Sequence, residues 1–203
     1  METGTVRIAS ISSAATHWLP PVIKQFRQEH PGIRFEVRTG NFAGMLELLR
    51  TGSVDFAITT TEAAGSYESI PLKDGRMLAV LPRGHRLADR DVVRLEDLRE
   101  EHILLERGDF HEPTIALASL GIYSQAPIDV ENDDHAIMAM VEQGLAVTIL
   151  SELMLERNPF DVVCLPVDPP IIRKLGCVSK DFNAMPVAAK QFLKALQESI
   201  KMR

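Results

Sequence analysis

The chain of 203 residues lacks the features that mark membrane proteins, secreted proteins and nucleic-acid binders. No run approaches the roughly 18 uncharged apolar residues of a membrane span, and residues 1–10 lack the basic and apolar regions of a secretory signal. Its 22 basic and 28 acidic side chains give a net charge of -6 without a Lys/Arg cluster, whereas phosphate contacts supply most of the affinity for nucleic acids. We therefore expect a cytoplasmic chain that has no membrane partner and does not bind duplex DNA specifically by itself.

The short motifs of common enzymes and metal sites are also missing. The sequence has no G-x-G-x-x-G, Walker A, H-E-x-x-H, C-x-x-C or G-x-S-x-G motif. The acidic stretch DVENDDH at 129–135 lacks the glycine and the distal Glu of an EF-hand loop. One of Asn132, Asp133 or Asp134 is better suited to cap a helix that starts near His135. We therefore expect no catalytic residue, no metal and no cofactor.

What is present is the composition of an ordinary globular protein. The chain is 45% hydrophobic and 25% charged, so it can bury a core and is not expected to be disordered. Its only two cysteines, Cys164 and Cys177, have apolar neighbours, which is typical of reduced, buried thiols in the cytoplasm.

The first third of the chain alternates strand and helix patterns. Leu19, Val22, Ile23 and Phe26 recur at the spacing of one helix face. The predicted elements are a strand at 5–10, a helix at 19–29, a strand at 33–38, a helix at 42–50 and a strand at 54–59. Short connections in such a series predict a parallel sheet with right-handed crossovers. The serine-rich segment between the first strand and the first helix is predicted to be a turn.

A second α/β series follows a change of pattern near residue 67. Its predicted elements are a strand at 102–105, a helix at 113–120, a strand at 128–131, a helix at 135–143 and a strand at 146–150, followed by a terminal helix over 187–200. Breaks at 82–85 and at the prolines near 166–170 are candidate crossings between lobes. We expect two α/β lobes joined by two crossover strands: lobe I from 1–82 with 168–203, and lobe II from 83–167.

Polar residues collect where predicted strands end. Ligands of open α/β sheets bind at the carboxyl ends of strands, and a cleft between the lobes would be lined by such residues. The candidate ligand-binding residues are Ser12, Ser13, Asn41, Thr59, Thr60, Glu106, Arg107, Asn132, Asp133 and Thr148. Alternatives remain: Ser12 and Ser13 would equally cap a helix, Glu106 and Arg107 would form a salt bridge, and Thr59 and Thr60 would be simple turn residues.

Several segments together resemble the effector-binding domain of LysR-type transcriptional regulators. They are VRIASISSAATHWLPPVIKQFRQEHPGIRFEVRTGN, LLRTGSVDFAI, LPRGHRLA, LEDL and MVEQGLAVTIL, in that order and spacing. The likeness extends from Val6 to about Leu196. It implies the type 2 periplasmic-binding-protein fold, with a small-molecule effector between two α/β lobes.

By position, the resemblance implies that Ser13, Thr60 and Asn132 contact the effector, for which an organic anion is one candidate. Ile11 and Ala14 stand where many relatives offer polar groups, so effector identity stays open. The resemblance also implies a homodimer, and DNA binding only through an amino-terminal winged helix-turn-helix that this chain lacks. Two alternatives are a free solute-binding protein, and an enzyme on the same fold for which Glu106 and His111 are the only nominated acid and base.

Overall fold

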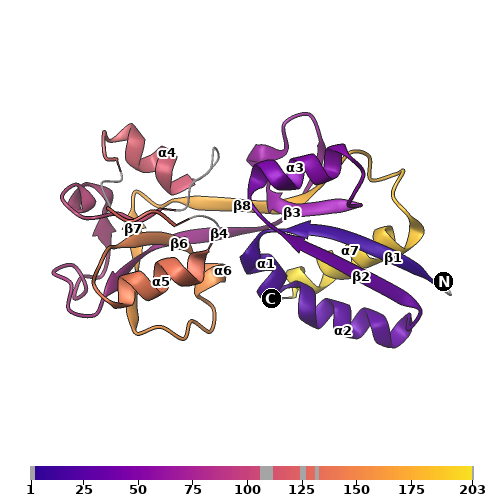
Figure 1. Ribbon diagram of the computed structural model, residues 1–203, viewed down its shortest axis with the longest axis horizontal. Coiled ribbons are helices and arrows are strands. Elements are labelled where there is room, and N and C mark those ends of the chain that lie inside the picture. Colours follow the sequence, from indigo (N-terminus) through magenta and orange to yellow (C-terminus); the bar gives the residue numbers. More distant parts are fainter. Residues whose placement is uncertain (1–2, 106–111, 124–126, 131–132, 203) are drawn as a thin grey trace. The chain divides into compact units, whose positions relative to one another are not determined.

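The computed structural model describes residues 3–105, 112–123, 127–130 and 133–202. The chain divides into two compact units, Met1–Asp74 with Lys174–Arg203 (unit 1) and Gly75–Arg173 (unit 2). Strands β4 (Glu68–Pro82) and β8 (Ile172–Ser179) each run through one of these divisions (Figure 1). The sequence patterns placed the crossings near 82–85 and 166–170, whereas the divisions lie at 74/75 and 173/174.

Unit 1 contains the predicted parallel sheet. Its strands are β1 (Gly4–Ser10), β2 (Ile33–Thr39), β3 (Phe56–Thr60) and the end of β8, in the order β2-β1-β3-β8. Strand β1 pairs in parallel with both β2 and β3, and β8 is antiparallel to β3. The predicted β-α-β-α-β series is therefore confirmed, and β2 forms an edge of the sheet.

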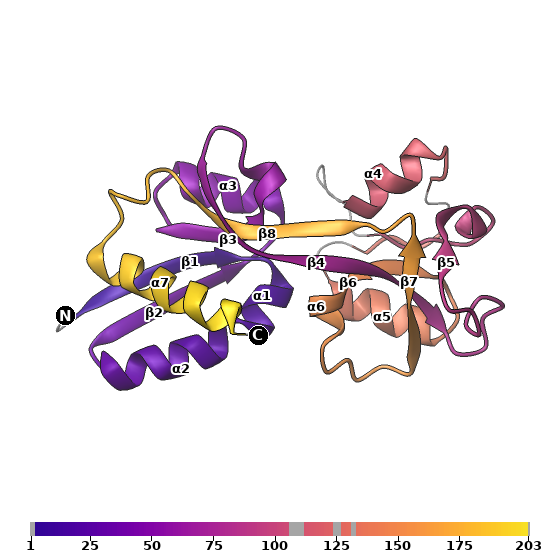
Figure 2. The ribbon, with the colours of Figure 1, turned by 180° about the vertical axis from the view of Figure 1, so that it is seen from behind.

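Helices cover both faces of this sheet. Helices α2 (Leu19–Glu29) and α7 (Val187–Lys201) lie side by side on one face, and α3 (Phe42–Arg50) lies on the other (Figures 1 and 2). Phe192 of α7 packs against Phe26 and Phe35 with ring centroids 5.4 and 4.8 Å apart. Successive residues of a strand point to opposite faces of the sheet. Ala9 and the buried residues clustered with it lie on the other face, where they pack under α3.

A short helix, α1 (Ser12–His17), stands where we expected only a turn. Its first five residues are small or hydroxyl-bearing. Ala14 and Ala15 favour helix because they lose no side-chain entropy on ordering. The expectation of a turn was therefore wrong. The chain passes from α1 through Trp18 directly into α2, which begins with Leu19 and two prolines.

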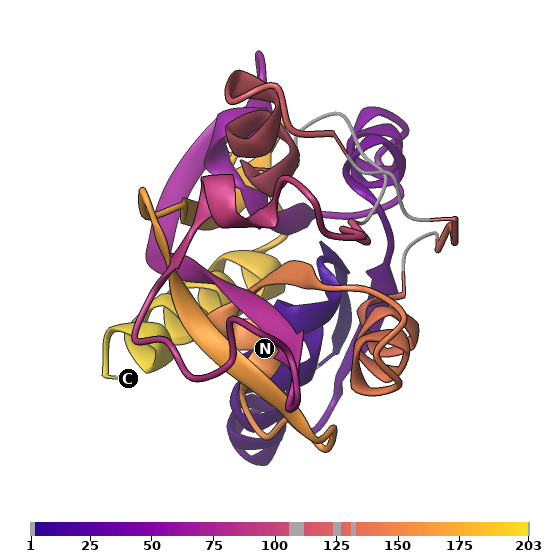
Figure 3. The same cartoon turned by 90° about the vertical axis from the view of Figure 1, so that its left-hand side faces the viewer.

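Unit 2 has strands β6 (Thr148–Ser151) and β7 (Val162–Asp168) on either side of β4, and β5 (Val93–Arg94) beyond β7. Figure 3 shows β4 and β7 side by side, in agreement with their antiparallel pairing. Helix α4 (Glu112–Ser119) packs through Leu117 on one buried cluster, and α5 (Asp134–Glu142) packs through Met138 and Val141 on another. Short helical turns complete the units: η1 (Thr61–Ala64), η2 (Leu95–Leu98) and α6 (Glu152–Leu155).

Two of the strands predicted for unit 2 do not form strands among the described residues. The segment 102–105 keeps a single parallel bridge, Ile103 to Val147, with the hydrogen bonds Leu104 N–H to Val147 O and Val147 N–H to His102 O. Residues 128–130 have no strand, and Pro127 before them has no N–H to donate to a ladder. Within the described ranges, no helix has the length and apolarity needed to span a membrane.

Candidate functional site

The ends of β1 and β3 lie side by side in unit 1. Ser10 is opposite Ile58 in the parallel ladder, and the Ile11 N–H donates to the Ile58 carbonyl at 3.1 Å. Because both strands run in the same direction, the residues that follow them emerge at the same edge of the sheet. The structure therefore brings the segment with Ser12 and Ser13 next to the segment with Thr59 and Thr60.

Three of the hydroxyl side chains at this edge are withdrawn from solvent. Ser13 is 4% exposed and Thr59 is 2% exposed. The Thr60 hydroxyl is buried and has no hydrogen-bond partner among the described residues. A buried polar group without a partner costs about 1–3 kcal/mol. A bound molecule that reached this hydroxyl would supply the missing hydrogen-bond partner.

The structure rules out helix capping as the role of Ser12 and Ser13. The N-cap of α1 is Ile11, no side chain caps it, and the two serines are the first two residues of the helix. The reason is that Ile11 still bonds to Ile58, which extends β1 by one residue before the helix begins. Ser12 is exposed and Ser13 is buried, so Ser13 is the better placed of the two for an enclosed contact.

A matching position in unit 2 shows how unusual the Thr60 hydroxyl is. Thr60 at the end of β3 and Ser151 at the end of β6 are both N-caps of short helical turns, with nearly equal backbone angles (φ -69, ψ 135 and φ -70, ψ 141). The Ser151 hydroxyl accepts a hydrogen bond from the Met154 N–H at 3.2 Å. No side chain caps η1. The Thr60 hydroxyl therefore lacks the capping hydrogen bond that the Ser151 hydroxyl makes at the matching position in unit 2.

Asn41 and Asp133 serve as helix caps. The Asn41 side chain accepts from the Gly44 N–H at 2.9 Å at the start of α3. The Asp133 carboxylate accepts from the Ala136 N–H at 3.0 Å at the start of α5. Of the three capping candidates in the acidic stretch, Asp133 is thus the cap. Both side chains are exposed, and one oxygen of each is already engaged.

Thr148 belongs to unit 2. It begins β6 opposite Val80 of β4, it is 1% exposed, and its hydroxyl has no partner among the described residues. Its role in ligand binding stays a prediction. Four residues that the sequence suggested for ligand binding or catalysis lie outside the described residues: Glu106, Arg107, His111 and Asn132.

Sequence reasoning missed a partly buried ion pair in unit 2. Arg173 of β8 binds Glu112 of α4 through its Nε and Nη2 atoms, and the shortest contact is 2.7 Å. Nearby, burial raises the pKa of the Asp134 carboxyl, and the charge of Arg173 opposes this effect. The partners are 61 positions apart, and no local pattern joins them. Within the described ranges, no group of three His, Cys, Asp or Glu side chains is placed to hold a metal ion.

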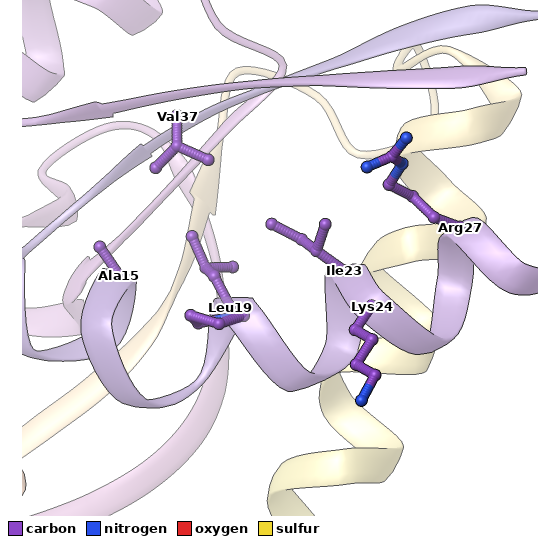
Figure 4. A pocket seen from close by; sticks show the side chains of 7 residues that line it. Ala15, Leu19, Ile23, Lys24, Arg27 and Val37 are labelled. Atoms are coloured by element: carbon purple, nitrogen blue, oxygen red, sulfur yellow. The ribbon is translucent and has the colours of Figure 1, made fainter. Parts of the chain in front are cut away.

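A separate apolar groove lies on the surface of unit 1, between α2 and the edge strand β2. It has a volume of about 530 Å³. Figure 4 shows Leu19 and Ile23 of α2 reaching toward Val37 of β2, with Arg27 at one end. The lining residues are Ala15, Leu19, Pro20, Ile23, Lys24, Arg27 and Val37.

Comparison with curated proteins finds transcriptional regulators. The uncharacterized HTH-type transcriptional regulator YvbU of Bacillus subtilis (strain 168) is 26% identical over 200 residues, which cover 98% of this chain and 68% of that protein. The transcriptional dual regulator GltC of the same organism is 29% identical over 196 residues, covering 93% of this chain and 65% of that protein. The chain thus spans about two thirds of the length of these relatives.

Solved structures with the same fold include ligand complexes. The effector-binding domain of QuiR in complex with shikimate superposes with a TM-score of 0.85 at 20% identity, covering 100% of this chain and 99% of that one. The Synechocystis PCC6803 CcmR regulatory domain in complex with 2-PG has a TM-score of 0.87 at 19% identity, covering 98% of each chain. The family model described as the LysR substrate binding domain matches residues 1–201. The chain therefore belongs to the LysR substrate-binding domain family, as an effector-binding domain with the type 2 periplasmic-binding-protein fold.

Proposed function

We propose that the chain senses a small organic anion through the hydroxyl and backbone N–H groups that follow β1 and β3. The observation that carries the proposal is the buried Thr60 hydroxyl, which has no partner among the described residues and lies at the same sheet edge as Ser13. Donors of this kind bind carboxylate and hydroxyl oxygens. The complexes of QuiR with shikimate and of CcmR with 2-PG support a small anionic effector.

We further propose that effector binding controls transcription through a DNA-binding domain elsewhere in the parent protein, in the cytoplasm. The curated relatives are HTH-type regulators that extend beyond the region matched here. The present chain has a net charge of -6, so we expect it not to bind duplex DNA specifically by itself. A salt-sensitive, sequence-selective gel shift with this chain alone would contradict that expectation.

The effector proposal is tested by a thermal-shift screen of small organic acids that includes shikimate, followed by titration of any stabilising compound. A compound that binds only the folded state raises the melting temperature. Removing one ordinary hydrogen bond or stranding its partner costs about 1–3 kcal/mol, so Ser13→Ala and Thr60→Val should weaken binding by about five- to a hundred-fold. Thr16→Ala, on the exposed side of α1, is the matched control. Unchanged affinity in both site variants would place the pocket elsewhere.

The same titrations distinguish a sensor from an enzyme. The family consists of transcriptional regulators, and we propose that this chain has no catalytic activity. Mass spectrometry should recover the bound compound unchanged after prolonged incubation. Its conversion to a product by the wild type, and not by buffer alone, would favour the enzyme alternative.

We also propose that the groove between α2 and β2 is buried in a two-fold homodimer. Strand β2 is an edge strand of the sheet that the described residues form, and its Val37 side chain is 40% exposed beside the apolar groove. Charges alternate along the same edge, with Glu36 between Arg34 and Arg38. A two-fold axis near Val37 would therefore set Glu36 of one copy against Arg38 of the other.

A further inference from the structure

Gly176 of β8 lies at a buried position of unit 1 that has no room for a side chain. A Cβ atom at this residue would lie 2.6 Å from the carbonyl oxygen of Ile70 and closer still to the Cγ2 methyl of Thr61. Neither approach is possible for a real Cβ atom, and a backbone oxygen does not move aside as the end of a flexible side chain can. Gly176 is not one of the glycines with positive φ. Glycine is therefore needed here because other segments approach closely, and not because of the backbone conformation.

The groups that fill this space come from both ends of one segment of the chain. Thr61 is the first residue of η1, and Ile70 is the third residue of β4. Two further contacts join the start of η1 to β8: the Thr61 hydroxyl donates to the Lys174 carbonyl at 3.4 Å, and Lys174 Nζ lies 3.1 Å from Glu62 Oε1. The first is long, and the second is exposed and therefore weak. The packing at Gly176 is thus the tightest of the contacts that seat η1 on β8.

Thr60 is the residue between two contacts with Gly176. Thr59 stands opposite Gly176 in the ladder between β3 and β8, and Thr61, which follows Thr60, packs directly on it. Both neighbours of Thr60 are thereby fixed to β8. Ser151 has nearly the same backbone angles as Thr60 and its hydroxyl caps α6, whereas the Thr60 hydroxyl does not cap η1. The backbone angles at Thr60 therefore do not explain why its hydroxyl is left without a partner among the described residues.

We propose that Gly176 is a positioning residue for the candidate site of unit 1. Its bare backbone seats Thr61 on β8, and this seat holds η1 where its N–H groups do not meet the Thr60 hydroxyl. A methyl group at position 176 would push the turn off β8 and let the hydroxyl cap it, as Ser151 caps α6. The consequence for effector binding rests on the function proposed above, because an effector would then meet a hydroxyl oxygen that is already engaged as an acceptor.

The proposal is tested without any ligand, by NMR of protein labelled with ¹³C and ¹⁵N. Three-bond couplings from the Thr60 Cγ2 methyl to its backbone nitrogen and carbonyl carbon report the side-chain rotamer. Gly176→Ala should change these couplings several-fold, because the hydroxyl turns toward η1. Gly4→Ala in β1 is the matched control and should leave them unchanged, because a Cβ atom there meets nothing closer than 3.4 Å. If Gly176 is merely structural, or if the methyl of Thr60 sets its own rotamer, Gly176→Ala leaves the couplings unchanged, and that result would overturn the proposal.

A second substitution at Thr61 tests whether the seat is the cause. Thr61→Ser removes the Cγ2 methyl but keeps the hydroxyl that bonds to Lys174. Added to Gly176→Ala, it should return the Thr60 couplings part of the way to their wild-type values, since the Ile70 carbonyl still meets the new methyl group. No return would exclude Thr61 as the contact and overturn the seat.

Thr61→Ser by itself decides the question if Gly176→Ala does not fold. Loss of the methyl empties part of the seat, so the Thr60 side chain should exchange between rotamers and its couplings should move toward averaged values. Unchanged couplings in this variant would contradict the proposal. None of these measurements uses an effector, so failure here leaves the effector proposal standing. That proposal is tested separately, through the affinities of the Ser13 and Thr60 variants.

Discussion

The Asp133 carboxylate accepts a hydrogen bond from the Ala136 backbone N–H at 3.0 Å and closes the start of α5. A side-chain cap satisfies one of the free N–H groups in the first turn of a helix. The role of Asp133 in ligand binding stays a prediction, whereas its capping role is a feature of the fold. The two roles have different consequences when the residue is changed.

We expect Asp133→Ala to lower the free energy of unfolding by about 0.5–2 kcal/mol without ligand, the usual cost of losing a cap. Asp133→Ser should retain most of the stability, because serine also caps helices. Urea denaturation of the three proteins measures the effect, with Asp91→Ala as an exposed control. An equal loss in Asp133→Ser and Asp133→Ala would show that the contact with Ala136 is not the cause.

Thr60 and Ser151 should respond in opposite directions to loss of their hydroxyls. Thr60→Val removes a buried hydroxyl without a partner among the described residues, so we expect the unliganded protein to gain up to about 1 kcal/mol. Ser151→Ala removes the cap on the Met154 N–H, so we expect a loss of about 1 kcal/mol. Chemical denaturation decides the signs. A large loss in Thr60→Val would indicate a structural role for its hydroxyl.

The proposed dimer face should be sensitive to charge. Ile23→Asp and Val37→Asp each place a carboxylate in the apolar groove, and an unpaired charge is costly to bury in an interface. Sedimentation velocity should show a dimer for the wild type and monomers for both variants. Val187→Asp, at a position that is 60% exposed and does not line the groove, should stay dimeric. A monomeric wild type at high micromolar concentration would refute the proposal.

The raised pKa of Asp134 predicts a specific dependence of stability on pH. Burial favours the protonated carboxyl in the folded protein, so ionisation of Asp134 lowers stability. This loss begins as the pH rises above the ordinary carboxyl pKa and is complete above the raised pKa of the folded state. The advantage of Asp134→Asn over the wild type should therefore grow through this range and then stay constant. Urea denaturation of both proteins at a series of pH values through the carboxyl titration range measures this difference in stability. A stability advantage of Asp134→Asn that is present only at acidic pH would contradict the prediction, because its dependence on pH would be reversed.

Cys177 should be inert in the folded protein. It is fully buried in β8, and burial raises the pKa of its thiol far above the ordinary value. The thiolate is the reactive form. In Cys164→Ala, an aromatic disulfide reagent should therefore react with Cys177 only at the rate of unfolding. Rapid stoichiometric reaction of the folded variant would contradict this. Cys164 is half-buried and its pKa is also raised by burial, so we expect it to react slowly in Cys177→Ala.

Local patterns alone determined most of unit 1. The helices at Leu19–Glu29 and Phe42–Arg50 have the bounds that their apolar spacing predicts, and β2 extends one residue beyond its predicted end. Apolar periodicity acts over a few residues, so it can be interpreted without knowledge of the fold. The short parallel connections, together with the resemblance of the quoted segments, were sufficient to identify the fold and the family.

Only the tertiary structure decided which polar groups meet and which are already used. The segments with Ser13 and Thr60 lie at the same edge of the sheet because β1 and β3 are paired neighbours. The series of short connections predicts a parallel sheet but does not say which of its strands are neighbours. The same holds for Arg173 and Glu112, which are joined by packing across 61 positions. The segment 102–105 has the composition of a strand but keeps only one bridge, because a strand requires a partner of matching length as well as suitable residues. Propensity is a local property, whereas the satisfaction of a buried hydroxyl or charge depends on neighbours that the chain brings together only when it folds.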